Sequence, residues 1–230
     1  METAVIIANG PSLKNVPNEW LDKYPTFGAN RVFLKYNPTY LTLVDVKMVH
    51  TPGLREEALA AFPKSKEVFL SKDASLLFDT PLGDNVSVTD WYNVYGEDDK
   101  LLPVFSIQPL TMLVSGGTVT YCSFQLAAWK GFQRLLIVGL NHTFRDPRGD
   151  HFDPAYNKDV GIPYEKEMTE VSEGSRGAGK WFWSETSFRR KTDQFYAIAA
   201  EHFRKTGGEI INCTPDSLCR AFPIRDWRDF

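Results

Sequence analysis

The densest group of reactive side chains lies in residues 145–156, which read RDPRGDHFDPAY. His151 directly follows Asp150 in this stretch. A histidine titrates near neutral pH and a neighbouring carboxylate can orient its ring, so His151 with Asp150 is a candidate general base. Asp150 and Asp153 could also hold a divalent metal ion, which prefers oxygen ligands. The stretch, which also contains Arg145 and Arg148, therefore predicts acid–base chemistry or a metal site, although a solvated charged loop has the same composition.

A second candidate site is the sequence Ser115-Gly116-Gly117-Thr118, which directly precedes an apolar helical pattern. The two glycines let the backbone approach a ligand closely, and Thr118 is a suitable helix N-cap. The first amide groups of such a helix point at the same place, so the turn predicts a phosphate or carboxylate site. The stretch matches neither a Walker A loop nor a GxGxxG fingerprint.

Polar residues also follow the predicted strands of a parallel sheet. They are Asn9, Gly10, Pro11 and Ser12 after residues 3–8, Asn30 after a strand that follows KYPTF, Asp45 at the end of residues 40–45, and Asn141 and His142 after residues 135–140. The carboxyl ends of parallel strands meet at one edge of a sheet, where ligands bind in open α/β folds. These side chains therefore predict a polar-ligand site, although such residues also favour ordinary turns.

The elements that position these residues alternate between strands and helices. Short apolar runs predict strands at 3–8, 40–45, 67–71, 135–140 and 209–213, and helical patterns lie at 54–62, 118–131 and 184–208. Helices that hand over to strands through glycine, at Gly131 and Gly208, are typical of α/β proteins. We therefore expect one α/β domain over residues 1–230, with a Rossmann-like three-layer fold and a mostly parallel sheet.

Two stretches depart from this alternation. Residues 72–112 have weak strand signals and many turn formers, and residues 143–183 are about 40 residues with poor periodicity. Long irregular segments inside a compact domain are usually binding loops or lids. We expect residues 143–183 to form a lid over the site.

The composition excludes several classes of protein. The net charge of −3 gives no support for nucleic-acid binding. Three cysteines without a CxxC pair predict no disulfide framework and no zinc site of the usual local spacing. No apolar run is long enough to span a membrane and no signal-like segment opens the chain, so we expect a cytoplasmic protein. Peripheral membrane contact and oligomerisation stay open.

The residues VIIANGPSL (5–13) resemble the opening motif of bacterial sialyltransferases that use CMP-activated sialic acid. The likeness continues at FGANRVF (27–33) and at VSGGTVTYCSFQLAAWKGFQRLLIVGLN (114–141). The later stretches GDHFDPAY and EIINCTPDSLCRAFP are similar to MptE-like proteins, which include an archaeal hydroxymethylpterin diphosphokinase. Both groups have Rossmann-like folds and bind a nucleotide.

This resemblance implies roles for particular residues. Asn9 and Asn30 would contact the nucleotide sugar, and Ser115 and Gly116 the donor. In the sialyltransferases two tyrosines after the corresponding strand hold the leaving phosphate, but this chain has no tyrosine between Asn141 and Asp153. The residues available to replace them are His142, Arg145, Arg148 and His151.

The resemblance implies a glycosyltransferase that uses a nucleotide-activated sugar, with a CMP-linked acid sugar such as sialic acid as donor and a glycan as acceptor. His151 would deprotonate the acceptor hydroxyl, and no metal cofactor is required. The first alternative is an MptE-like diphosphokinase acting on a pterin-like alcohol, which needs ATP and Mg²⁺ held by Asp45 and Asp150. The second is a nucleotide- or glycan-binding protein without catalysis.

Overall fold

The computed structural model describes residues 1–92, 104–143, 151–158 and 185–230. Its centre is a seven-stranded parallel sheet in the order β5-β4-β3-β2-β1-β8-β9. The strands are β1 (Thr3–Ile7), β2 (Thr26–Ala29), β3 (Tyr40–Leu43), β4 (Glu67–Ser71), β5 (Val86–Thr89), β8 (Arg134–Val138) and β9 (Glu209–Asn212). The predicted α/β class and parallel sheet are therefore confirmed.

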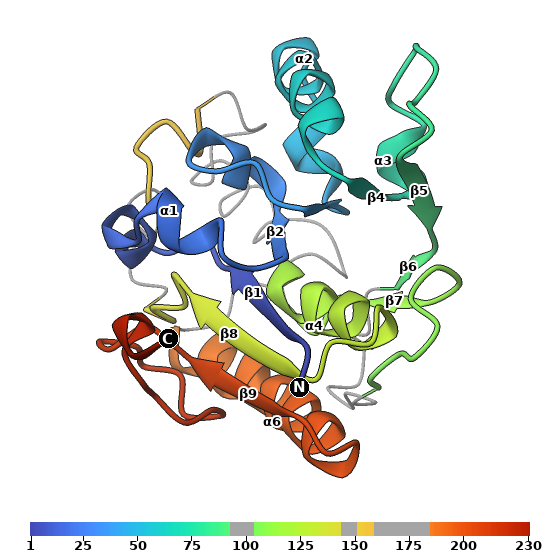
Figure 1. Cartoon of the computed structure of the whole chain (residues 1–230). Coiled ribbons are helices and arrows are strands. Elements are labelled where there is room, and N and C mark those ends of the chain that lie inside the picture. The colour runs from blue at the N-terminus through green and yellow to red at the C-terminus, as the bar shows by residue number, and fades with distance from the viewer. Residues whose placement is uncertain (93–103, 144–150, 159–184) are drawn as a thin grey trace.

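Helices cover the sheet on both faces. They are α1 (Asn18–Leu21), α2 (Pro52–Ala61), α3 (Lys72–Ser75), α4 (Val119–Trp129) and α6 (Glu185–Lys205). Short 3₁₀ helices lie between them at η1 (Pro11–Asn15), η2 (Asn30–Leu34), η3 (Val46–Val49), η4 (Phe62–Lys64) and η6 (Trp227–Asp229). Figure 1 shows α4 beside β1 and β2, and α6 alongside β9.

The alternation of side chains along the central strands builds two separate hydrophobic cores. On β1, Ala4 and Ile6 join the core shared with α4 and α6, whereas Val5 and Ile7 join the core shared with α1 and α2. Successive side chains of a strand point to opposite faces, so a continuous apolar run produces a sheet buried on both sides. This burial explains why short unbroken apolar runs identified the inner strands.

The strand order places a topological switch point between β1 and β8. From β1 the chain moves outward through β2, β3, β4 and β5, and it later places β8 and β9 on the other side of β1. Ligands of open α/β sheets bind outside the carboxyl ends of the strands at such a switch point. The fold therefore directs attention to the residues that follow β1 and β8.

The irregular stretch before α4 contains structure that the sequence did not predict. Residues 86–89 form the edge strand β5, and β6 (Trp91–Tyr92) pairs with β7 (Leu113–Val114) in a small parallel sheet. The first three residues of β5 are only half-buried or exposed, so the strand lacks the apolar run of an inner strand. Most of the expected lid, residues 144–150 and 159–183, lies outside the described residues.

No helix among the described residues is both long enough and apolar enough to cross a membrane.

Candidate functional site

Two turns meet at the switch point between β1 and β8. The amide of Gly10 donates a hydrogen bond to the carbonyl of Gly139 (2.9 Å). Ser12 donates twice to Asn141 Oδ1, from its backbone amide (3.0 Å) and from its hydroxyl (2.7 Å). Pro11 opens the 3₁₀ helix η1 between these contacts. The predicted residues after β1 and those after β8 are therefore in direct contact.

Asn9 and Asn30 lie at the ends of adjacent strands and meet a tyrosine. Asn9 Nδ2 donates to the carbonyl of Ala29 (3.0 Å) and to the hydroxyl of Tyr156 (2.9 Å). The side chain of Asn30 contacts the same hydroxyl. Burial raises the pKa of Tyr156, and its contact with Asn30 offsets only part of that effect. The tyrosine is therefore a neutral hydrogen-bonding group that joins the two strand ends.

Asn30 adopts a backbone conformation that few side chains tolerate. Its φ angle is 55°, in the left-handed region, where asparagine is several-fold enriched among non-glycine residues. Asn30 is 8% exposed, and the Oδ1 atoms of Asn9 and Asn30 are buried without a hydrogen-bond partner. A buried acceptor without a partner costs free energy, so this pair of oxygens is a candidate site for a ligand's donor groups.

The segment 151–158 packs over these asparagines. The amide of Phe152 donates to the carbonyl of Asn9 (3.0 Å), and the ring of His151 stacks on Tyr156 with 3.9 Å between centroids. His151 therefore lies at the end of the sheet that carries the polar cluster. Arg145, Arg148 and Asp150 lie outside the described residues.

Arg31 fixes this segment to the sheet. It is 3% exposed, its Nη1 donates to the carbonyls of Ala155 (2.7 Å), Tyr156 (2.6 Å) and Lys158 (3.0 Å), and its Nη2 forms an ion pair with Glu57 (2.7 Å). The planar guanidinium has five donors in fixed directions, which suits it to several acceptors at once. The sequence did not predict a role for Arg31, because the residue belongs to no recognisable local motif.

Asp45 belongs to the same edge of the sheet. It follows β3 by two residues, and its carboxylate accepts a hydrogen bond from the amide of Lys47 (3.0 Å) as the N-cap of η3. Its charge also contributes to the raised pKa of Tyr156, although burial is the largest cause. Asp45 therefore lies within electrostatic range of Tyr156, with one oxygen engaged in a helix cap.

The turn before α4 has a left-handed backbone at its two glycines, a conformation that glycine adopts readily. The φ angles are 52° at Gly116 and 81° at Gly117, and Ser115 is buried. Thr118 is the N-cap residue of α4, but its side chain makes no capping hydrogen bond, so the predicted cap is wrong in that detail. Instead its hydroxyl pairs with the Tyr196 hydroxyl of α6 at 2.9 Å, because α6 packs directly against α4.

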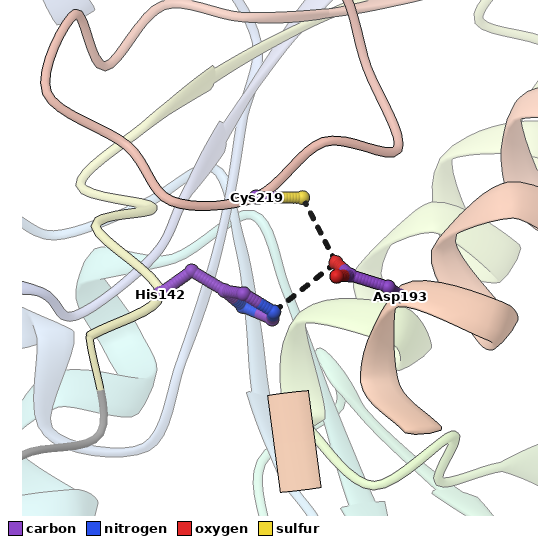
Figure 2. A group of neighbouring side chains, drawn as sticks. All are labelled: His142, Asp193 and Cys219. Atoms are coloured by element: carbon purple, nitrogen blue, oxygen red, sulfur yellow. Dashed lines mark hydrogen bonds and ion pairs between the residues drawn. The ribbon is translucent and has the colours of Figure 1, made fainter. Parts of the chain in front are cut away.

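His142 forms a cluster with one residue of α6 and one residue of the chain after β9. Its Nε2 lies 3.2 Å from Asp193 Oδ1, and the thiol of Cys219 lies 3.6 Å from the same oxygen. Figure 2 shows the three side chains pointing toward one another from three separate segments. The ring of His142 is also near Tyr196, with 5.7 Å between centroids. Burial raises the pKa of the Cys219 thiol to about 12, so without a further cation it is protonated.

Sequence reasoning missed Asp193, Tyr196 and Cys219. All three cysteines are free and buried, as the absence of a disulfide framework predicted. Cys122 lies on α4 and is buried in the hydrophobic core. Cys219 instead belongs to a polar cluster with His142, 77 residues earlier in the sequence, and Asp193, 26 residues earlier. No local spacing could reveal that cluster, because the fold alone brings its members together.

No model of a known protein family matches the chain, and no curated protein matches it.

Proposed function

We propose that the protein binds a nucleotide-activated sugar at the carboxyl edge of its sheet and transfers the sugar to a glycan. The observation that carries this proposal is a row of three polar groups along that edge. They are Asn30, Tyr156 and Asn9, then Ser12 and Asn141, and then His142 beside the ring of Tyr196, whose hydroxyl pairs with Thr118. A nucleotide sugar has enough polar atoms to pair with several of these groups, and precisely placed polar groups fix the orientation of a bound ligand.

The asparagine pair would recognise the nucleoside part of the donor. Their free Oδ1 atoms are acceptors for amino or hydroxyl groups. Both oxygens are buried, and contacts of Tyr156 and Phe152 with Asn9 hold the segment 151–158 beside them. A ligand that pairs with these oxygens would have to displace that segment. The described residues 151–158 are thus the part of the expected lid that bears on this proposal.

The turn at 115–118 would receive the phosphate. Its left-handed glycines bring backbone amides to the N-terminus of α4, where the helix dipole favours negative charge. His151, stacked on Tyr156 beside the asparagines, is the proposed base for the acceptor hydroxyl. The motif resemblance to CMP-dependent sialyltransferases favours a CMP-linked acid sugar as the donor.

Asp45 is the observation that favours the diphosphokinase as a second candidate. A carboxylate within electrostatic range of Tyr156 is a suitable ligand for the Mg²⁺ that ATP requires. A protein that only binds the nucleotide would use the same contacts without turnover. The three functions differ in their nucleotide, in their need for metal and in their products.

Calorimetric titration with CMP, CDP, UDP, GDP, ADP and ATP, each with and without Mg²⁺, tests these functions. We expect CMP or CDP to bind without metal and a CMP-sugar to be hydrolysed slowly. Binding of ATP only with Mg²⁺ would favour the kinase, and binding without turnover would leave the binding protein. If no nucleotide binds, the proposal is wrong.

The variant Asn30→Gly sharpens the test, because glycine keeps the left-handed backbone and removes only the amide. We expect its CMP affinity to fall about tenfold, the loss of one hydrogen bond inside a site. Asn85→Ala is the matched control: Asn85 also uses its amide, on the carbonyls of Phe62 and Ser65, but it precedes β5 at the opposite edge of the sheet. Its CMP affinity should equal that of the wild type.

A further inference from the structure

His142, Asp193 and Cys219 bring a nitrogen, an oxygen and a sulfur ligand to one point. The three donor atoms all lie within 4.8 Å of one another, the one such group of three among the described residues. They come from the turn after β8, from α6 and from the chain after β9 (Figure 2). His142 also belongs to the proposed nucleotide site, but Asp193 and Cys219 have no role there.

Two of the three separations between ligand atoms are close to those of a tetrahedral metal centre. Zinc binds histidine nitrogen at about 2.0–2.1 Å, carboxylate oxygen at about 2.0–2.2 Å and thiolate sulfur at about 2.3 Å. At tetrahedral angles these bonds separate nitrogen from oxygen by about 3.3–3.5 Å and sulfur from oxygen by about 3.5–3.7 Å. The observed separations are 3.2 Å between His142 Nε2 and Asp193 Oδ1, and 3.6 Å between Cys219 Sγ and Asp193 Oδ1.

A simple ion pair explains the group less well. Hydrogen bonds between a charged nitrogen donor and a carboxylate are usually about 2.7–2.9 Å long, shorter than the separation of His142 and Asp193. His142 also has a left-handed backbone, with φ of 60°, a conformation that persists only where the surrounding structure imposes it. The fold thus holds the imidazole toward the cluster at a local cost.

The surroundings keep the three ligands in place. The amide of Leu218 donates to the carbonyl of Asn141 (2.9 Å), which ties the segment carrying Cys219 to the turn carrying His142. The side chains of His142 and Cys219 are fully buried, whereas that of Asp193 is 30% exposed. The carboxylate therefore offers an ion a route from solvent into a site that is otherwise already formed.

We propose that His142, Asp193 and Cys219 bind a zinc ion, with a fourth position open to water or a ligand. Mixed nitrogen and sulfur ligands favour zinc over Mg²⁺ or Ca²⁺, which prefer oxygen alone. Three protein ligands with an open position are the arrangement of zinc sites that act on a ligand. The site adjoins Tyr196 and Thr118 at the start of α4, so it is placed to bear on a molecule bound at that turn.

The test uses the full chain, freed of metal by a chelator and titrated with Zn²⁺ and separately with Co²⁺. We expect binding of one equivalent of Zn²⁺, and a Co²⁺ complex with a thiolate-to-cobalt charge-transfer band and the strong visible absorption of tetrahedral cobalt. Asp193→Asn removes a partly exposed ligand with little change in shape. It should weaken Zn²⁺ binding by at least about tenfold, because even partners outside the ligand set are worth about 10–100-fold.

Cysteine variants provide the matched comparison. Cys219→Ser should abolish the charge-transfer band, whereas Cys213→Ser, which changes a buried cysteine outside the cluster, should retain it. Wild-type protein that binds no Zn²⁺ would overturn the proposal, as would a band that survives in Cys219→Ser. If Cys219→Ser does not fold, Asp193→Asn decides the matter: an affinity equal to that of the wild type refutes the site. None of these measurements depends on nucleotide binding.

Discussion

At the scale of single residues, Tyr156 connects the site to the fold. Its hydroxyl accepts a hydrogen bond from Asn9, which also holds the end of β2 through the carbonyl of Ala29. Both amide hydrogens of Asn9 are thereby used, and its oxygen is left without a partner. Tyr156 is thus part of the scaffold that presents the asparagine oxygens to a ligand.

Tyr156→Phe should lower the free energy of unfolding by about 1–3 kcal/mol, because it leaves a buried amide hydrogen of Asn9 without an acceptor. Urea unfolding followed by circular dichroism measures the change. Tyr36→Phe is the control, since its hydroxyl donates to Asp22 at the surface (2.8 Å) and its loss should change stability by no more than about 0.5 kcal/mol. Equal losses in the two variants would contradict the role given to Tyr156.

At the scale of elements, the turns after β1 and β8 lie so close together that position 10 has no room for a side chain. A Cβ atom on Gly10 would lie 2.4 Å from the carbonyl oxygen of Gly139 and 2.6 Å from Asn141 Oδ1. The backbone of Gly10 itself is extended, with φ of −73°, so the requirement for glycine is one of space alone. The NGPS motif therefore serves the packing of two strands as well as the site.

Gly10→Ala should accordingly destabilise the protein by about 1–3 kcal/mol, since the methyl group forces the two turns apart. Gly53→Ala is the matched control, because a Cβ atom there meets nothing within 4 Å and the residue lies in the first turn of α2. That variant should be more stable than the wild type by about 0.4–1 kcal/mol. The two changes in unfolding free energy should thus have opposite signs, and a stable Gly10→Ala would refute the steric argument.

Elements were predictable from sequence wherever burial is complete and local signals agree. The apolar runs that became β1, β3, β4, β8 and β9 are buried on both faces, and the glycines after α4 and α6 mark their ends. The edge strand β5 was missed because its exposed positions carry no continuous apolar run. The strand-end residues Asn9, Asn30 and Asn141 follow from the same logic, because parallel strands end at one edge.

The partners of those residues were not predictable in the same way. Arg31 meets carbonyls more than 120 residues away, and Cys219 meets an aspartate of α6. Such contacts depend on how crossovers return to the sheet, which no local spacing encodes. The sequence therefore indicates where a site lies in this fold, and three-dimensional packing determines which side chains complete it.

At the scale of the whole molecule, the buried interior contains ionisable groups that are neutral in the folded state. Tyr121 lies in the core shared by α4 and α6, and burial raises its pKa, as it does for Tyr156. Burial also raises the pKa of the Cys122 thiol to about 12. Each of these groups ionises more readily in the unfolded chain, where water solvates the charge.

This difference makes the whole fold sensitive to alkali. A group whose pKa is raised on folding contributes stability below its unfolded pKa, here about 9 for a thiol and about 10 for a phenol, and that contribution is lost as the pH rises toward the folded value. The free energy of unfolding should fall by about 1.4 kcal/mol per pH unit for each such group once the unfolded form ionises. Urea unfolding at a series of pH values from about 8 to about 11 measures the slope.

Tyr121→Phe isolates one contribution to that slope. The variant loses the hydrogen bond from the Tyr121 hydroxyl to the carbonyl of Val104 (3.0 Å), so it should be less stable than the wild type near neutral pH. Above pH about 10 its stability should fall less steeply, by about 1.4 kcal/mol per pH unit, and the two curves should converge. Parallel curves over that range would show that Tyr121 ionises equally in both states, because only a group with different folded and unfolded pKa values links proton release to unfolding.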